Sequence, residues 1–116
     1  MLVLCYPKCT TCQKALRYLQ DRGIVCEIRD IKLEHPTEEE LRTWWQASGL
    51  PLKKFFNTSG LQYKALGLKD KLPTMTEDEQ LALLATDGML VKRPLVVGED
   101  FVLTGFRPAE WDEKIR

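Results

Sequence analysis

The sequence lacks a long apolar run, a net charge and a recognisable targeting signal. No apolar stretch approaches the roughly 20 residues that span a membrane, and the short apolar start has no basic lead-in and stops at Pro7. Basic and acidic residues number 17 each, so no strong electrostatic footprint for nucleic acid or an anionic membrane is expected. We therefore expect a cytoplasmic protein that binds neither nucleic acid directly nor membranes.

The chain also has no internal repeat, linker or low-complexity stretch. Its 116 residues, 44% of them hydrophobic, suit one ordinary globular domain over residues 1–116.

The N-terminal part predicts a strand, a helix and a second strand. The apolar residues 2–6 are typical of a short buried strand. From Cys12 to Arg22, apolar residues recur with the i, i+3, i+4, i+7 spacing of an amphipathic helix, which should stop at Gly23. Residues 24–31 favour a strand again, so the two strands should run parallel, as in other βαβ units.

Residues 37–88 predict a helical insertion. Capping boxes at Thr37 and Thr76 should open helices that end at Gly49 and Gly88. Shorter helices are expected after Pro51 and over residues 61–66.

The last third returns to strands. Residues 95–97 and 101–103 flank three residues that include Gly98, which is typical of a hairpin. A final helix should start at Pro108 and bury Trp111 and Ile115. The whole pattern, βαβ–helical insertion–ββα, predicts an α/β protein with a mixed sheet and a thioredoxin-like (glutaredoxin-like) fold.

Cys9 and Cys12 form a C-x-x-C motif at the predicted turn from strand to helix. A helix N-terminus favours an anion, so the pKa of Cys9 should fall below the free value of about 8.5. Residues i and i+3 on a helix have Cβ atoms roughly 5–6 Å apart, and a disulfide needs about 4 Å, so a small adjustment would join them. We assign Cys9 as the exposed nucleophile and Cys12 as the resolving thiol.

Two other interpretations of the cysteines are a zinc site and a purely structural role. Zinc usually takes four ligands from two such pairs, and the rest of the chain offers only Cys5, Cys26 and His35. We expect Cys5 and Cys26 to be small buried residues in strands and His35 to be a loop residue, so no metal site and no bound cofactor are predicted.

Arg93, Pro94 and Arg107 complete the candidate site. Pro94 precedes a predicted strand, where proline is tolerated, and thioredoxin-like folds place a cis proline beside the active cysteines; a trans proline at a strand start is the alternative. We expect both arginines to converge on the cysteine loop and bind an anion there, with Thr10 and Thr11. Solvent-facing loop positions are the alternative for the arginines.

The chain resembles the ArsC/Spx family of glutaredoxin-like arsenate reductases and their relatives, including the C-x-x-C-containing Spx and MgsR-type branch. The motifs that carry the resemblance are Tyr6-Pro7-Lys8-Cys9-Thr10-Thr11-Cys12, Tyr63-Lys64-Ala65-Leu66-Gly67-Leu68, Lys92-Arg93-Pro94-Leu95-Val96-Val97 and Gly105-Phe106-Arg107-Pro108. The resemblance implies a thioredoxin-like fold with a helical insertion, a nucleophile at Cys9, and oxyanion binding by Arg93 and Arg107.

Two departures from the arsenate reductases stand out. Those enzymes usually have one active cysteine and take the second thiol from glutathione, whereas Cys12 supplies it here. They also carry a third arginine in the middle segment, where Asn57 is the nearest match. A charged hydrogen bond is worth about 1.5–3 kcal/mol, so its loss disfavours arsenate reduction itself.

The sequence thus favours a thiol-dependent reductase that acts on a small-molecule or protein disulfide, an oxidised thiol or a small oxyanion. An external thiol system, glutathione with glutaredoxin or thioredoxin, would reset the Cys9–Cys12 pair. The alternatives are a redox-sensing regulator that binds RNA polymerase, as Spx does, and an interaction domain without redox chemistry.

Overall fold

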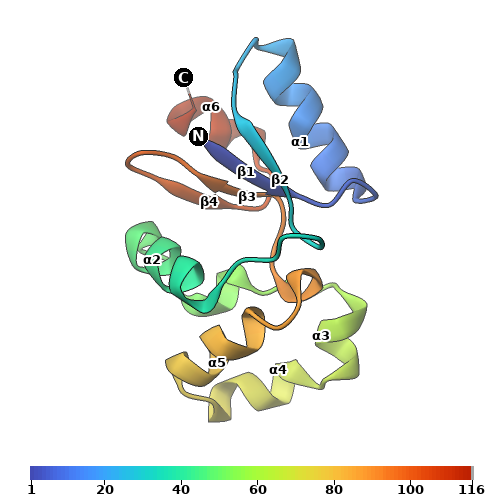
Figure 1. Ribbon diagram of the computed structural model, residues 1–116, viewed down its shortest axis with the longest axis vertical. Coiled ribbons are helices and arrows are strands. Elements are labelled where there is room, and N and C mark those ends of the chain that lie inside the picture. Colours follow the sequence, from blue (N-terminus) through green and yellow to red (C-terminus); the bar gives the residue numbers. More distant parts are fainter. Residues whose placement is uncertain (116) are drawn as a thin grey trace.

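The computed structural model describes residues 1–115 as a four-stranded sheet with helices on both faces (Figure 1). The strands are β1 (Leu2–Cys5), β2 (Glu27–Asp30), β3 (Leu95–Val97) and β4 (Val102–Thr104). The α-helices are α1 (Thr10–Asp21), α2 (Glu38–Ser48), α3 (Leu61–Ala65), α4 (Leu68–Lys71), α5 (Glu77–Leu84) and α6 (Pro108–Lys114). The 3₁₀ turns are η1 (Leu52–Phe55), η2 (Leu72–Thr74) and η3 (Gly88–Leu90). None of the helices in residues 1–115 is long and apolar enough to cross a membrane.

The sheet is mixed, as the sequence predicts, with the strand order β2-β1-β3-β4. β1 pairs in parallel with β2 and antiparallel with β3, and β3 and β4 form the expected antiparallel hairpin. Because successive side chains of a strand point to opposite faces, Leu4 packs toward the helical segment between β2 and β3, and Val3 packs toward α1 and α6. Figure 1 shows α1 and α6 on one face and α2 to α5 on the other.

Two boundaries in the βαβ unit differ from the prediction. Helix α1 begins at Thr10, so the whole C-x-x-C motif lies at its N-terminus. Strand β2 begins only at Glu27, because Leu2 is the first residue of β1 and pairs with Glu27. Residues 24–26 therefore have no strand partner on that side.

Both predicted capping boxes are confirmed, and each binds the start of its helix by side chain and backbone. Helix α2 ends at Gly49 as expected, but α5 ends at Leu84 rather than at Gly88. Gly88 is required for another reason, since an added Cβ would lie 1.8 Å from the backbone oxygen of Ile31. The elements α4, η2 and η3 were not predicted from the sequence, and β4 begins at Val102, one residue later than predicted.

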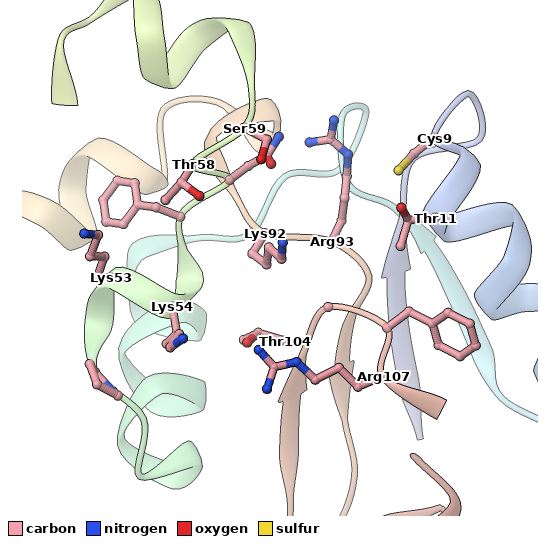
Figure 2. A pocket seen from close by; sticks show the side chains of 15 residues that line it. Cys9, Thr11, Lys53, Lys54, Thr58, Ser59, Lys92, Arg93, Thr104 and Arg107 are labelled. Carbon is pink, nitrogen blue, oxygen red and sulfur yellow. The ribbon is translucent and has the colours of Figure 1, made fainter. Parts of the chain in front are cut away.

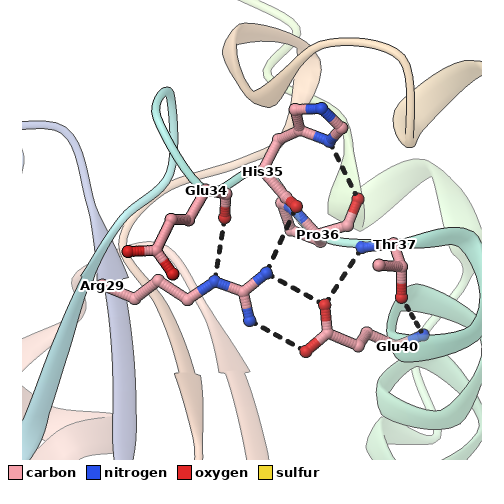
Figure 3. Close-up of polar contacts among 6 residues, drawn as sticks. All are labelled: Arg29, Glu34, His35, Pro36, Thr37 and Glu40. Carbon is pink, nitrogen blue, oxygen red and sulfur yellow. Dashed lines mark hydrogen bonds and ion pairs between the residues drawn. The ribbon is translucent and has the colours of Figure 1, made fainter.

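Arg29 joins the sheet to the start of α2 (Figure 3). Its guanidinium donates two hydrogen bonds to the Glu40 carboxylate, at 2.8 and 2.9 Å. It also donates to the backbone oxygens of Glu34 and His35. The carboxylate of Glu40 in turn accepts the backbone N–H of Thr37. This network fixes where the helical segment departs from the sheet, and His35 lies in a loop as predicted.

The C-terminal elements match the prediction closely. Helix α6 begins at Pro108 and buries Trp111 completely. Ile115 is 6% exposed and packs on the same face of the sheet.

Candidate functional site

Cys9 is the N-cap residue of α1, where the chain leaves β1 through a tight turn. Its backbone N–H donates to the Tyr6 oxygen at 3.0 Å, and the Gln13 side chain closes the turn through the Pro7 oxygen at 3.0 Å. The side chain of Cys9 is half-buried and caps no backbone group. The first turn of α1 contains no acidic residue, so the helix dipole favours an anion at this position.

Cys12 lies one turn further into α1 and is fully buried. A hydrogen bond from the Cys5 thiol is the main cause that lowers the pKa of Cys12 to about 6, against the opposing effect of burial. The backbone N–H of Tyr6, at 3.4 Å from the Cys12 sulfur, the Cys9 thiol and the charge of Arg93 lower this pKa further. These donors therefore stabilise the thiolate of Cys12 relative to that of a free cysteine.

Cys5 stays protonated because its thiol donates a hydrogen bond to the Cys12 sulfur. This hydrogen bond, followed by burial, raises the pKa of Cys5. Cys5 is buried at the end of β1, as the sequence predicts. The expectation for Cys26 was wrong, because this residue precedes β2 and is only half-buried. Burial raises the pKa of Cys26.

A pocket of about 620 Å³ opens beside Cys9 (Figure 2). Its lining comes from the start of α1, from η1 and the turn after it, from the residues before β3, and from the segment between β4 and α6. Sequence-distant segments thus meet around the sulfur that the sequence identifies as the nucleophile.

The structure brings Arg93 and Arg107 together at this pocket, along with Cys9 and Thr11. Thr10 and Pro94 are not among the lining residues: Thr10 is exposed on α1, and Pro94 is buried. The Arg93–Pro94 peptide bond is cis, as expected.

Two contacts, with Met89 and Tyr6, position the Arg93 guanidinium. One guanidinium nitrogen donates to the Met89 oxygen at 3.4 Å, and the guanidinium carbon lies 5.5 Å from the centre of the Tyr6 ring. Its Nε is buried and has no hydrogen-bond partner among residues 1–115. The remaining donors of the guanidinium are available to a ligand in the pocket.

Gly105 fixes the turn that carries Arg107. Its N–H donates to the Pro94 oxygen at 2.8 Å, and its oxygen accepts from the Trp111 indole at 3.2 Å. Its φ is 78°, in the left-handed region where glycine is favoured. The two arginine-bearing segments are therefore joined by backbone hydrogen bonds.

The pocket lining also contains cations that were not predicted from the sequence. Lys53 and Lys54 come from η1, Lys92 precedes Arg93, and Asn57 lies where the third family arginine was sought. The backbone N–H of Lys92 donates to the Phe55 oxygen at 2.8 Å, which ties η1 to the segment before β3. The signal was present in the sequence, since Lys53 and Lys54 directly precede the segment searched for an arginine.

The arrangement offers no site for a metal. Within the described part of the chain, no group of three or more histidine, cysteine or carboxylate side chains is placed to hold a metal ion. The chemistry available at the pocket is that of thiols beside positive charge.

Comparison with known proteins identifies the family to which this geometry belongs. The sequence model of the ArsC family matches residues 4–114. The chain belongs to the ArsC family. The cysteine turn, the cis proline and both arginines all lie inside the matched range.

Solved and curated ArsC-family relatives cover nearly the whole chain. The crystal structure of a putative ArsC family related protein from Bacteroides fragilis is 61% identical, with a TM-score of 0.94 over 97% of this chain and 94% of that one. YusI of Bacillus subtilis is 51% identical over 93% of this chain and 92% of its own. The regulatory protein MgsR of the same organism is 30% identical over 90% and 82%. These likenesses confirm the predicted thioredoxin-like fold.

Proposed function

We propose that this ArsC-family protein is a thiol-dependent oxidoreductase that reduces disulfides or oxidised thiols through Cys9 and Cys12. One observation carries the proposal: a half-buried Cys9 faces a cationic pocket while a fully buried Cys12 with a lowered pKa lies behind it. A dithiol mechanism requires an accessible nucleophilic thiol and a second thiol close enough to attack the mixed disulfide.

The first step is attack by Cys9 on the substrate. Cys9 loses its proton to solvent, and its sulfur attacks one sulfur of the disulfide R–S–S–R. A Cys9–S–S–R mixed disulfide forms, and the first RS⁻ leaves and takes up a proton. The attacking sulfur lies at the N-terminus of α1 and lines the same pocket as Arg93.

The second step is resolution by Cys12. Its thiolate attacks the Cys9 sulfur, the Cys9–Cys12 disulfide forms, and the second RS⁻ leaves. The substrate has then gained two electrons from the protein, and each released RS⁻ takes up its proton from solvent. An external dithiol or glutathione-type reductant returns the pair to thiols, and we propose that this exchange takes place in the reducing cytoplasm.

Exchange of each cysteine for serine tests the two roles. With 2-hydroxyethyl disulfide as substrate and dithiothreitol as reductant, Cys9→Ser should abolish turnover. Cys12→Ser, mixed with the disulfide before dithiothreitol is added, should instead accumulate the Cys9 mixed disulfide, visible as an added mass on the intact protein. Cys26→Ser, which changes a cysteine outside the pocket lining, is the matched control and should retain activity. Equal behaviour of the Cys9 and Cys12 variants would contradict the assignment.

A regulator is the second candidate, and the similarity to MgsR over most of both chains favours it. The same cysteine pair would then switch the binding of a protein partner, with RNA polymerase as the partner implied by the Spx resemblance. Turnover separates the two candidates. A regulator would bind the purified polymerase differently in its dithiol and disulfide forms. Each protein molecule would reduce only one substrate disulfide, without multiple turnovers.

A further inference from the structure

The pocket beside Cys9 carries a charge that the whole chain does not. Lysine plus arginine and aspartate plus glutamate balance at 17 each over the sequence. Yet Lys53, Lys54, Lys92, Arg93 and Arg107 line this one pocket, and no aspartate or glutamate of residues 1–115 lines it with them. The positive charge is therefore gathered at the site rather than spread over the surface.

These cations are not neutralised within the protein. No ion pair joins any of them to a carboxylate in residues 1–115. A cleft lined by charge of one sign concentrates the field and attracts ligands of the opposite sign.

The cations line the pocket on the side away from α1. Figure 2 shows Arg93 between Cys9 and the far wall, with Lys53 and Lys54 across the pocket from Cys9. A ligand that extends from Cys9 and carries negative charge at its far end would meet those two lysines.

We propose that the substrate is a low-molecular-weight disulfide whose thiol carries negatively charged groups, which Lys53 and Lys54 bind while Cys9 attacks the sulfur. This inference rests on the proposed oxidoreductase function and specifies its substrate class. The volume of about 620 Å³ lies within the range of roughly 300–1,000 Å³ typical of small-molecule sites.

The charge pattern beyond the pocket favours a small molecule over an acidic peptide. A second pocket of about 260 Å³ continues past Lys54 and Arg107, which line both. Asp100 and Glu110 line this second pocket beside Lys54, Arg107 and Lys114, so the purely cationic lining ends there. An acidic peptide that followed the groove would meet these carboxylates, whereas a compact anion would not.

Three disulfides of nearly equal size test the proposal: 3,3′-dithiodipropionate, 2-hydroxyethyl disulfide and cystamine, which are anionic, neutral and cationic. We expect kcat/KM to fall in that order, and the advantage of the anion to shrink as salt rises. The Lys53→Gln/Lys54→Gln double variant should lose about tenfold in kcat/KM for the anion and much less for the neutral disulfide.

A matched control removes two lysines elsewhere. Lys64→Gln/Lys71→Gln lowers the net charge equally, and both positions are exposed and outside the pocket, so the preference should stay intact. Equal rates with the anionic and neutral disulfides, or an unchanged preference in the Lys53/Lys54 variant, would overturn the proposal. Failure to reduce even the neutral disulfide would instead refute the proposed function.

A second pair of probes distinguishes a phosphate from a carboxylate as the charged group. The disulfides of pantetheine and 4′-phosphopantetheine differ only in the phosphates. A preference for the phosphorylated form that exceeds the preference for dithiodipropionate would assign a phosphate-bearing thiol. The reverse order would assign a carboxylate-bearing one.

Discussion

The backbone N–H of Tyr6 lies 3.4 Å from the sulfur of Cys12 and donates a hydrogen bond to it. This contact joins the end of β1 to the first turn of α1, so the strand and the helix together hold the resolving sulfur. It is one of several donors around a fully buried atom, together with the thiols of Cys5 and Cys9. The resolving sulfur thus lies behind the residue that meets substrate, among donors that lower its pKa.

The first prediction concerns the pH dependence of the resolving step. Because the pKa of Cys12 is lowered to about 6, the release of the second thiol should be independent of pH above about 7. Below pH 6 the thiolate fraction, and with it the rate, should fall about tenfold for each pH unit. Rapid quench of a preformed Cys9 mixed disulfide measures this rate. A rate that still rises between pH 7 and 9 would contradict the lowered pKa.

The second prediction assigns that pKa to the Cys5 hydrogen bond. Cys5→Ala removes the donor and should raise the pKa of Cys12, whereas Cys5→Ser keeps a hydroxyl donor and should preserve most of the lowering. The ultraviolet absorbance of the thiolate, followed against pH in a Cys9→Ser/Cys26→Ser background, reports Cys12 directly. Identical titration curves for the two Cys5 variants would contradict this assignment.

The third prediction concerns the turn that carries Arg107. Gly105→Ala should destabilise the fold by about 1–2 kcal/mol, because alanine is strained at a φ of 78°. The added Cβ would also lie 3.2 Å from Cε of Lys92, so the Lys92 side chain should move by a few tenths of an ångström. We expect kcat/KM for an anionic disulfide to drop more than kcat/KM for a neutral one. Chemical denaturation and the two substrates measure these effects.

The fourth prediction concerns stability in acid. Hydrogen bonds from Arg29 lower the pKa of Glu40 to about 2 from its ordinary 4.5. The ionised form is therefore stabilised by folding, and this contribution is complete above about pH 4.5 and lost as the pH falls toward 2. Glu40→Gln should lower stability at neutral pH and make the loss of stability between pH 5 and 2 shallower.

Glu39→Gln is the matched control for that measurement. Glu39 lies in the same first turn of α2 but is exposed, so its exchange should leave the acid transition nearly as steep as in the wild type. An equal flattening by both variants would assign the effect to the helix dipole rather than to Arg29.

The sequence predicted the fold where local chemistry decides it. The capping boxes at Thr37 and Thr76 and the apolar period of α1 are short-range patterns, and each marked a real helix. The start of β2 was wrong because it depends on where Leu2 begins to pair, a contact between separate segments. The prediction that a helix ends at Gly88 was wrong, because this glycine is needed where the chain passes close to the distant Ile31 backbone.

The candidate site was predictable only in part for the same reason. Cys9, Arg93 and Arg107 stand in motifs, and the fold brings them to one pocket. Lys53 and Lys54 stand in no motif and become part of the site only through the pairing of η1 with the segment before β3. The effect of Cys5 on Cys12 likewise requires the strand and helix to be packed together.

Peptide mass mapping of the wild-type protein after reaction with one equivalent of 2-hydroxyethyl disulfide shows directly whether Cys9 and Cys12 form the redox pair. We expect a single Cys9–Cys12 disulfide, with Cys5 and Cys26 still reduced and both substrate thiols released. A stable mixed disulfide on Cys9 beside a reduced Cys12, or a disulfide that joins Cys12 to Cys5 instead, would contradict it.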